Sequence, residues 1–111
     1  MTAGNASGIN DGAAMVLLAD DRSVREHGLT SRARIIETAV TGCDPALMGL
    51  GPVAAIRQVC SFANWQLEDV DAIEINEAFA AQTLGCVKEL GLDIRKVNQR
   101  GGAIEIGRAH V

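Results

Sequence analysis

The sequence predicts an α/β protein built from βαβ units, and three observations support this prediction. Short apolar runs of strand length alternate with segments whose apolar residues recur at helical spacing. From residue 33 onward the order is strand, helix, strand, helix, which is typical of a right-handed βαβ crossover. The 111 residues include 12 glycines and only 3% aromatic residues, a composition that favours part of a large, closely packed core over a free-standing small domain.

The first predicted elements are a glycine-rich loop and a buried strand. Residues 2–12 hold glycines among small polar residues, which indicates a loop, with one helical turn expected at residues 7–11. The apolar run that follows predicts a buried strand at residues 14–18. The chain is therefore expected to enter a sheet early.

A short helix is predicted next. Asp20 and Asp21 suit its N-terminus because a carboxylate there can accept a hydrogen bond from a free backbone N–H. His27 and Gly28 suit its end after Glu26, since glycine readily adopts the left-handed backbone that closes many helices.

A second strand and a longer amphipathic helix follow. Residues 33–40 alternate loosely and include β-branched side chains, which predicts the strand, and residues 42–45 break it. Pro52 suits the first position of the helix. Arg57 lies on its polar face, and its apolar side chains recur at helical spacing at Val53, Ile56, Cys60 and Ala63.

The last predicted pair is a strand at residues 70–75 and a helix at residues 77–90. The strand is apolar and ends in Asn76. Gly91 is expected to end the helix. This pair completes the predicted βαβ order.

The charge pattern argues against a nucleic-acid partner. The formal net charge is -4, and the ten lysines and arginines are scattered instead of forming a stripe that neutralises phosphates. No apolar run approaches the roughly 18–20 residues that cross a bilayer, and residues 1–10 lack the features of a signal sequence. We therefore expect no nucleic-acid partner, no membrane partner and a cytoplasmic location.

The three cysteines, Cys43, Cys60 and Cys86, predict neither a disulfide framework nor a metal site. They are odd in number, form no C-x-x-C pair and have no histidine at metal-ligand spacing. Free buried thiols are the expected state, and no metal is expected.

Asn76 is the first candidate functional residue. It stands where a predicted buried strand ends and a helix begins, which is the edge at which open α/β sheets bind ligands. Its carboxamide both donates and accepts hydrogen bonds, so it can hold a water molecule that stabilises negative charge on a carbonyl oxygen. The ordinary alternative is that Asn76 caps the helix that follows it.

Four motifs stand in order between Thr2 and Ile104. T-A-G-N-A-S-G-I-N-D-G-A-A begins at Thr2, P-x-L-M-G-L-G-P-V-A-A begins at Pro45, N-E-A-F-A-A-Q begins at Asn76, and V-N-x-x-G-G-A-I begins at Val97. Together they resemble the thiolase family, in its acetyl-CoA acetyltransferase branch.

The resemblance implies an incomplete thiolase-like α/β fold with fragments of two mixed sheets and βαβ units. Thiolases consist of two similar α/β halves, and by this resemblance residues 1–29 close the first half and residues 30–104 open the second. Strands that belong inside a sheet become edges in such a piece, and apolar helix faces meet water. We therefore expect the chain alone to be marginally stable or to aggregate.

Residues 105–111, E-I-G-R-A-H-V, depart from the family pattern. The codons GAG-ATC-GGA-AGA-GCA-CAC-GTC-TGA encode this peptide followed by a stop, and from its second base this run reads as a widely used sequencing-adapter oligonucleotide. We therefore expect a non-family, adapter-derived tail after Ile104, and an initiation at Met1 that lies inside a longer reading frame. Source DNA that runs through Val111 without adapter sequence would contradict this expectation.

The resemblance also implies a chemistry. An intact relative condenses acetyl-CoA to acetoacetyl-CoA or cleaves 3-ketoacyl-CoA, with the coenzyme A thioester as substrate and no other cofactor. It uses a nucleophilic cysteine, a histidine base and a second cysteine that moves the α-proton. A homo-oligomer in the cytoplasm, or in an organellar matrix in a eukaryote, is expected. The alternative is a non-catalytic CoA-binding or protein-interaction module.

The resemblance assigns roles to residues in two of the motifs. Asn76 matches the family's asparagine that orients an oxyanion-hole water. Ser7, with Ala3 and Ala6 beside it, matches the segment that lies along the pantetheine arm of CoA. Capping of a helical turn is the ordinary alternative for Ser7.

Two larger side chains match the acyl pocket of the family. These are Met48 in M-G-L-G-P and Phe79 in N-E-A-F. Packing in the core is the ordinary alternative for both. Glu77 is interpreted as a carboxylate near a helix N-terminus, where it suits the helix dipole.

The family's other catalytic groups have no match among these residues. By the resemblance, the nucleophilic cysteine lies upstream of the segment at Thr2 and the second cysteine beyond Val111. Arg108 stands at the position of the histidine base, and an arginine cannot accept the proton because it stays charged. His110 falls two positions late. We therefore expect the chain as given to be inactive.

Overall fold

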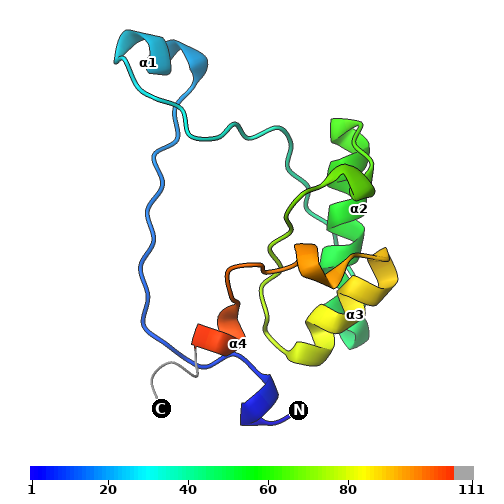
Figure 1. Cartoon of the computed structure of the whole chain (residues 1–111). Coiled ribbons are helices and arrows are strands. Elements are labelled where there is room, and N and C mark those ends of the chain that lie inside the picture. The colour runs from blue at the N-terminus through cyan, green and yellow to red at the C-terminus, as the bar shows by residue number, and fades with distance from the viewer. Residues whose placement is uncertain (107–111) are drawn as a thin grey trace.

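The computed structural model describes residues 1–106, with side chains as far as Ile104. Its regular structure is helical, in the order η1 (Ala3–Asn5), α1 (Asp21–Glu26), η2 (Pro45–Leu50), α2 (Gly51–Ala63), η3 (Leu67–Asp69), α3 (Ala80–Leu90), η4 (Ile94–Lys96) and α4 (Ala103–Ile106), where η denotes a 3₁₀ helix (Figure 1). Arg108 and His110 lie outside the described residues, as does most of the expected adapter-derived tail.

Helix α1 confirms the short helix predicted after the aspartate pair. It spans Asp21–Glu26, and the Asp20 carboxylate accepts a hydrogen bond of 2.7 Å from the Ser23 backbone N–H. This bond lowers the pKa of Asp20 because it stabilises the charged carboxylate. The helix ends at His27, and Gly28 follows with a φ of 60°, which glycine adopts without strain.

The helical turn of the N-terminal loop lies earlier than predicted. It occupies Ala3–Asn5 instead of residues 7–11. The reason is a closed pair of hydrogen bonds: the Thr2 N–H donates to Asn5 Oδ1 at 2.7 Å, and the Asn5 N–H donates to Thr2 O at 3.1 Å.

The strands predicted at residues 14–18 and 33–40 are not confirmed. Both segments are long irregular connections that link α1 to the rest of the molecule (Figure 1). Met15 is 98% exposed and Ile35 is 68% exposed. A strand needs a neighbour to pair its backbone groups and cover its side chains, and residues 1–106 supply none for these segments. Their apolar side chains therefore remain in water.

Helix α2 confirms the predicted amphipathic helix. It spans Gly51–Ala63, with Pro52 in its first turn and Val53 buried. Asn64 ends it in the left-handed conformation, with a φ of 56°, and donates its backbone N–H to the carbonyl groups of Cys60 and Ser61. These hydrogen bonds satisfy carbonyl groups of the last turn and end the helix at Ala63.

The stretch Pro45–Ala63, formed by η2 and α2, is long and apolar enough to cross a membrane by length and composition, with a mean hydropathy of 1.3. The sequence analysis expected no such stretch. Leu47 interrupts it with non-helical angles, φ -119° and ψ 24°. The guanidinium of Arg57 donates to the Glu89 backbone carbonyl of α3 at 2.8 Å. We therefore interpret the stretch as a helix packed against α3.

Helix α3 confirms the last predicted helix but begins later. It spans Ala80–Leu90 instead of starting at residue 77, and Gly91 ends it with a φ of 65° as expected. The start moves because residues 77–79 have other partners, which include the N-terminal segment and the loop after η4.

The βαβ unit predicted between residues 33–40 and 70–75 is not confirmed, and the structure holds a different, minimal βαβ arrangement around α3. Ile73 and Val97, which lie on either side of α3, form an isolated parallel bridge. The Ile73 N–H donates to Lys96 O at 2.8 Å, and the Asn98 N–H donates to Ile73 O at 2.9 Å. The mixed sheets expected from the resemblance are not confirmed, because the described residues hold this bridge and one antiparallel bridge but no longer ladder.

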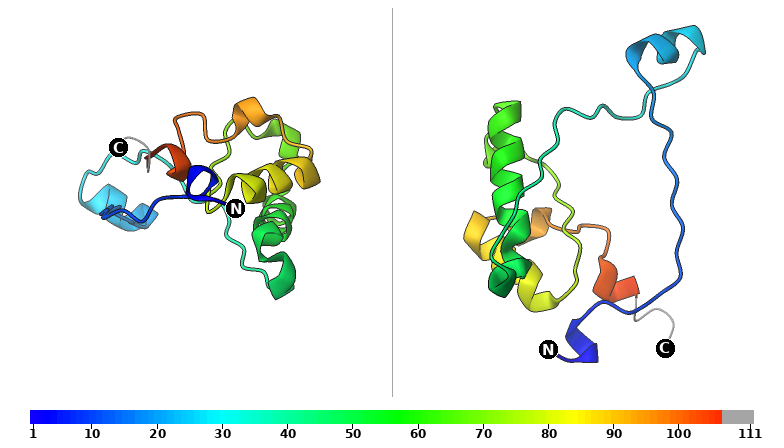
Figure 2. Two further views of the ribbon diagram at one scale, coloured as in Figure 1. Left: turned by 90° about the horizontal axis from the view of Figure 1, so that it is seen from below. Right: turned by 180° about the vertical axis from the view of Figure 1, so that it is seen from behind.

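The buried core lies between α2, α3 and the Ile73–Val97 bridge. Figure 2 shows α2 and α3 packed side by side, with α1 well apart from them. The core side chains that are buried are Val53, Ile75, Cys86 and Val97. This small core positions the segment that leads into Asn76.

A local carboxylate at the start of η4 gives a first prediction. The Asp93 carboxylate accepts from the Arg95 backbone N–H at 2.9 Å and from the Arg95 guanidinium at 2.7 Å. These hydrogen bonds lower the pKa of Asp93 from 3.8 to about 2. Because the folded pKa is depressed, the cap is fully formed above about pH 4 and is lost as the pH falls through about 2.

An NMR titration of Asp93 should give a midpoint near 2, and Arg95→Ala should move it towards 3.8. An unshifted midpoint in the unsubstituted chain would show that this local cap does not form in it.

Candidate active site

Two motif segments that are far apart in the sequence meet at the end of the Ile73–Ile75 segment. Ala6 and Phe79 form an antiparallel bridge, and the Ser7 N–H donates to Ala78 O at 3.1 Å. The structure therefore brings Ala6 and Ser7, matched to the CoA arm, beside Phe79, matched to the acyl pocket. Ala3 lies just before them in η1.

Asn76 stands between the buried Ile75 and this meeting point, and it is exposed. Its carboxamide has no hydrogen-bond partner among residues 1–106. The alternative that Asn76 caps α3 is wrong, because the N-cap of α3 is Phe79 and no side chain caps it. Asn76 therefore keeps both donor and acceptor free for a ligand or a water molecule.

Asn98 fixes the backbone on the near side of Asn76. Its Oδ1 accepts from the Ile75 N–H at 2.8 Å, and its Nδ2 donates to Ile75 O at 2.9 Å. The carboxamide of Asn98 thus satisfies both backbone groups of a buried residue, as a neighbouring strand would. Asn98 has a φ of 48°, a left-handed conformation that asparagine tolerates better than most residues.

Glu77 fixes the far side of Asn76. Its Oε1 accepts from Asn98 Nδ2 at 2.9 Å, and its Oε2 accepts from the Ile104 N–H at 3.1 Å. The interpretation of Glu77 as a carboxylate in the first turn of a helix is therefore corrected, because α3 starts at Ala80 and Glu77 binds another loop. The sequence analysis did not foresee these hydrogen bonds of Glu77 and Asn98. The only sequence feature that pointed to them was the V-N-x-x-G-G-A-I motif, which contains Asn98 and Ile104.

Met48 lies in η2, on an element that packs against α3. It is 71% exposed, while Gly49 beside it accepts the Cys86 S–H through its carbonyl oxygen at 3.3 Å. A methyl group at Gly49 would lie 3.2 Å from Gln82 Cγ, so the two elements approach closely there. Met48 is thus held on the neighbouring element, with its side chain largely exposed among the described residues.

Cys86 is a structural thiol. It is fully buried, and burial raises its pKa because the charged thiolate is poorly solvated there. A nucleophilic cysteine needs an accessible, stabilised thiolate. Cys86 therefore lacks the environment of a nucleophile. The expectation of buried thiols is confirmed for Cys86 but is wrong for Cys43, which is exposed, and Cys60 is only half-buried.

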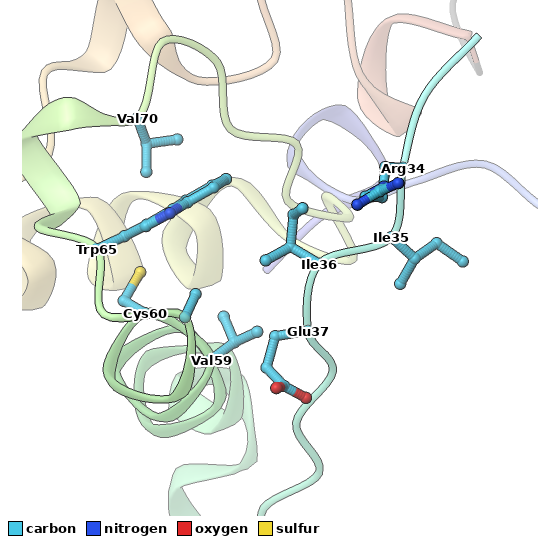
Figure 3. A pocket seen from close by; sticks show the side chains of 9 residues that line it. Arg34, Ile35, Ile36, Glu37, Val59, Cys60, Trp65 and Val70 are labelled. Carbon is cyan, nitrogen blue, oxygen red and sulfur yellow. The ribbon is translucent and has the colours of Figure 1, made fainter. Parts of the chain in front are cut away.

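An apolar pocket of about 300 Å³ lies apart from the predicted site residues. The segment 34–37 lines one side, and the C-terminal end of α2 with Trp65 lines the other (Figure 3). Ile36, Val59 and Val70 contribute apolar side chains to it. The pocket does not include any residue that the resemblance assigns to the active site.

Comparison with known proteins agrees with the motif resemblance. The family model of the thiolase C-terminal domain matches residues 29–110. Over 107 residues the chain is 56% identical to the acetyl-CoA acetyltransferase of Chromobacterium violaceum, with 96% of this chain and 27% of that protein covered.

Two solved structures show the same relation in three dimensions. Human mitochondrial 3-ketoacyl-CoA thiolase superposes with a TM-score of 0.94 at 50% identity, over 96% of this chain and 27% of that one. The dimeric peroxisomal thiolase of Saccharomyces cerevisiae superposes with a TM-score of 0.92 at 48% identity, with the same coverage. The chain thus spans about a quarter of the length of these proteins. It belongs to the thiolase family.

Proposed function

We propose that this chain is a segment of an acyl-CoA thiolase that, in its complete form, condenses acetyl-CoA to acetoacetyl-CoA or cleaves 3-ketoacyl-CoA. The observation that supports this most directly is the pairing of Ala6 with Phe79 beside an exposed, unpartnered Asn76. The relatives named above are an acetyl-CoA acetyltransferase and 3-ketoacyl-CoA and peroxisomal thiolases, and their names support an acyl-CoA thiolase as the parent protein. They lend no support to the alternative of an independent CoA-binding module.

Asn76 is proposed to act on the carbonyl oxygen of the thioester. Negative charge develops on this oxygen when a nucleophile attacks the carbonyl carbon or when the α-proton leaves. A water molecule held by the Asn76 carboxamide would donate a hydrogen bond to that oxygen. The free state of the side chain supports this role, because both N–H donors and both acceptor positions of the carboxamide are available to hold a water.

The N-terminal segment is proposed to hold the pantetheine arm of CoA. Ala3, Ala6 and Ser7 have small side chains, which let an extended ligand approach the backbone closely. The hydrogen bond from Ser7 to Ala78 supports this role because it ties the arm-binding segment to the loop of Asn76. Met48 and Phe79 are proposed to line the acyl pocket.

The complete enzyme is proposed to be a homo-oligomer of the bacterial cytoplasm or of an organellar matrix. The yeast relative is a dimer from the peroxisome, the human relative is mitochondrial, and the Chromobacterium relative is bacterial. By the same proposal the 111 residues alone are inactive, because Cys43, Cys60 and Cys86 match neither catalytic cysteine of the family and the family's base position falls on Arg108.

A chimera tests the proposed function. Residues 2–104 of this chain replace the aligned segment of the Chromobacterium violaceum acetyl-CoA acetyltransferase, and this protein is called the chimera below. Thiolysis of acetoacetyl-CoA by CoA is measured by the loss of the substrate's enolate absorbance. We expect turnover of the same order as the recipient enzyme and none from the 111-residue chain at equal concentration. A chimera that melts like the recipient but does not turn over would refute the proposal.

A further inference from the structure

We propose that Glu77 is a positioning residue that holds the loop carrying Asn76 against the loop of residues 98–104. The hydrogen bonds of Glu77 and Asn98 that join these two loops are called the lock below. The inference rests on the proposed function, because it assigns Glu77 a part in placing Asn76 for catalysis. It rests on geometry that the sequence motifs did not reveal.

Both oxygens of the Glu77 carboxylate are bound by the same loop. Oε1 accepts from Asn98 Nδ2 at 2.9 Å, and Oε2 accepts from the Ile104 backbone N–H at 3.1 Å. Hydrogen bonds to a charged acceptor are stronger than those between neutral groups. Glu77 therefore holds two points of residues 98–104 at once.

Asn98 extends the lock to the other side of Asn76. Its carboxamide binds the N–H of Ile75 at 2.8 Å and the carbonyl of Ile75 at 2.9 Å, and it also donates to Glu77. The residues directly before and after Asn76 are thus tied to one side chain. The Asn76 side chain is left free while its backbone position is fixed on both sides.

Gly102 shows how closely the two loops approach. A Cβ atom built on Gly102 would overlap the carboxylate of Glu77. Gly102 is not among the glycines with positive φ, whereas its neighbour Gly101 has a φ of 95°. The two glycines are therefore needed for different reasons: Gly101 for its backbone conformation, and Gly102 to leave room for Glu77.

The first part of the test measures catalysis in the chimera. Glu77→Ala should lower kcat by roughly 10- to 100-fold, because small displacements of a catalytic group have effects of this size, and it should leave KM within about twofold. Glu77→Gln should lose less activity. Its amide oxygen can still accept from the Ile104 N–H, while its NH₂ group faces the donor Nδ2 of Asn98.

The second part measures whether Glu77 and Gly102 act as a pair. Gly102→Ala alone should lower both kcat and the melting temperature, because the new methyl group displaces the Glu77 carboxylate. In the Glu77→Ala background the same change should add little, since the methyl group then enters empty space. Gly101→Ala is the matched control, because its backbone strain is the same in both backgrounds and its effects should add.

The outcomes separate the lock from the proposed function. An inactive chimera would refute the function, while the melting temperatures of the four proteins in the Glu77–Gly102 cycle would still test the lock. Additive effects of Glu77→Ala and Gly102→Ala on the melting temperature would overturn the lock. A Glu77→Ala chimera that raises KM at unchanged kcat would overturn its positioning role.

Discussion

Asn76→Ala in the chimera is expected to lower kcat by about 100- to 1,000-fold, which is the usual effect of removing one donor from an oxyanion-stabilising site. The loss should appear in kcat and kcat/KM alike, because the interaction with the carbonyl oxygen strengthens only as charge develops. The melting temperature should hardly change, since the Asn76 carboxamide is exposed and makes no hydrogen bond within residues 1–106.

Two further variants test whether the loss of kcat in Asn76→Ala comes from the missing N–H donor. Asn76→Asp keeps the shape but removes the N–H donor and adds a negative charge near the developing oxyanion, so its kcat should fall at least as far. Gln99→Ala is the control, because it removes an exposed carboxamide from the neighbouring loop. It should keep kcat within about twofold. Near-normal turnover by Asn76→Ala would show that Asn76 has no part in the chemistry.

The 111-residue chain by itself is expected to show no cooperative thermal transition. Its accessible surface is 9007 Å², whereas a compact monomer of 11.6 kDa exposes about 5,800 Å². Its radius of gyration is 16.6 Å, against about 13 Å for a compact domain of this length. So little buried apolar surface cannot offset the conformational entropy of ordering the connecting segments.

Circular dichroism and cysteine labelling test whether the isolated chain lacks a cooperative fold. Ellipticity should change gradually on heating, and sedimentation should show an expanded or associated species. Alkylation followed by mass spectrometry should modify Cys86 nearly as fast as the exposed Cys43. In the chimera Cys86 should be protected, because the rest of the enzyme completes its surroundings. A monomer with one sharp transition and a protected Cys86 would contradict the expectation.

The helices could be predicted because their signals are local. The aspartate that caps α1, the proline in the first turn of α2 and the glycine that ends α3 each act within a few residues of the helix end. Among α1, α2 and α3, only the start of α3 was misplaced, because residues 77–79 have partners in other parts of the chain. Local signals therefore gave the right element type and an approximate boundary.

The strands could not be predicted from local signals in the same way. Residues 14–18 and 33–40 have strand-like composition, but a strand exists only where a second segment pairs with it. The Ile73–Val97 pair forms because α3 returns the chain to the same place. The chain spans about a quarter of its relatives, so composition alone overestimated the sheet content of this segment.

The candidate site could be read from the sequence only in part, for the same reason. Asn76 stood out as a candidate because its position after an apolar run and before a helix is a local feature. Glu77 was misread because its partners, Asn98 and Ile104, lie on another loop. No periodicity or capping rule connects residues that meet only in three dimensions. The requirement for Gly102 became clear only when the position of the Glu77 carboxylate was known.

The pairing of Ala6 with Phe79 also has a consequence for the order in which this part of the enzyme is made. The two residues are separated by more than 70 positions, and a ribosome adds about 5–20 residues per second. The N-terminal segment therefore emerges from the ribosome roughly 4–15 s before its partner has been synthesised. Throughout that interval its apolar neighbours at residues 14–18 are available to chaperones, and the pairing of Ala6 with Phe79 forms only when the loop of Asn76 arrives.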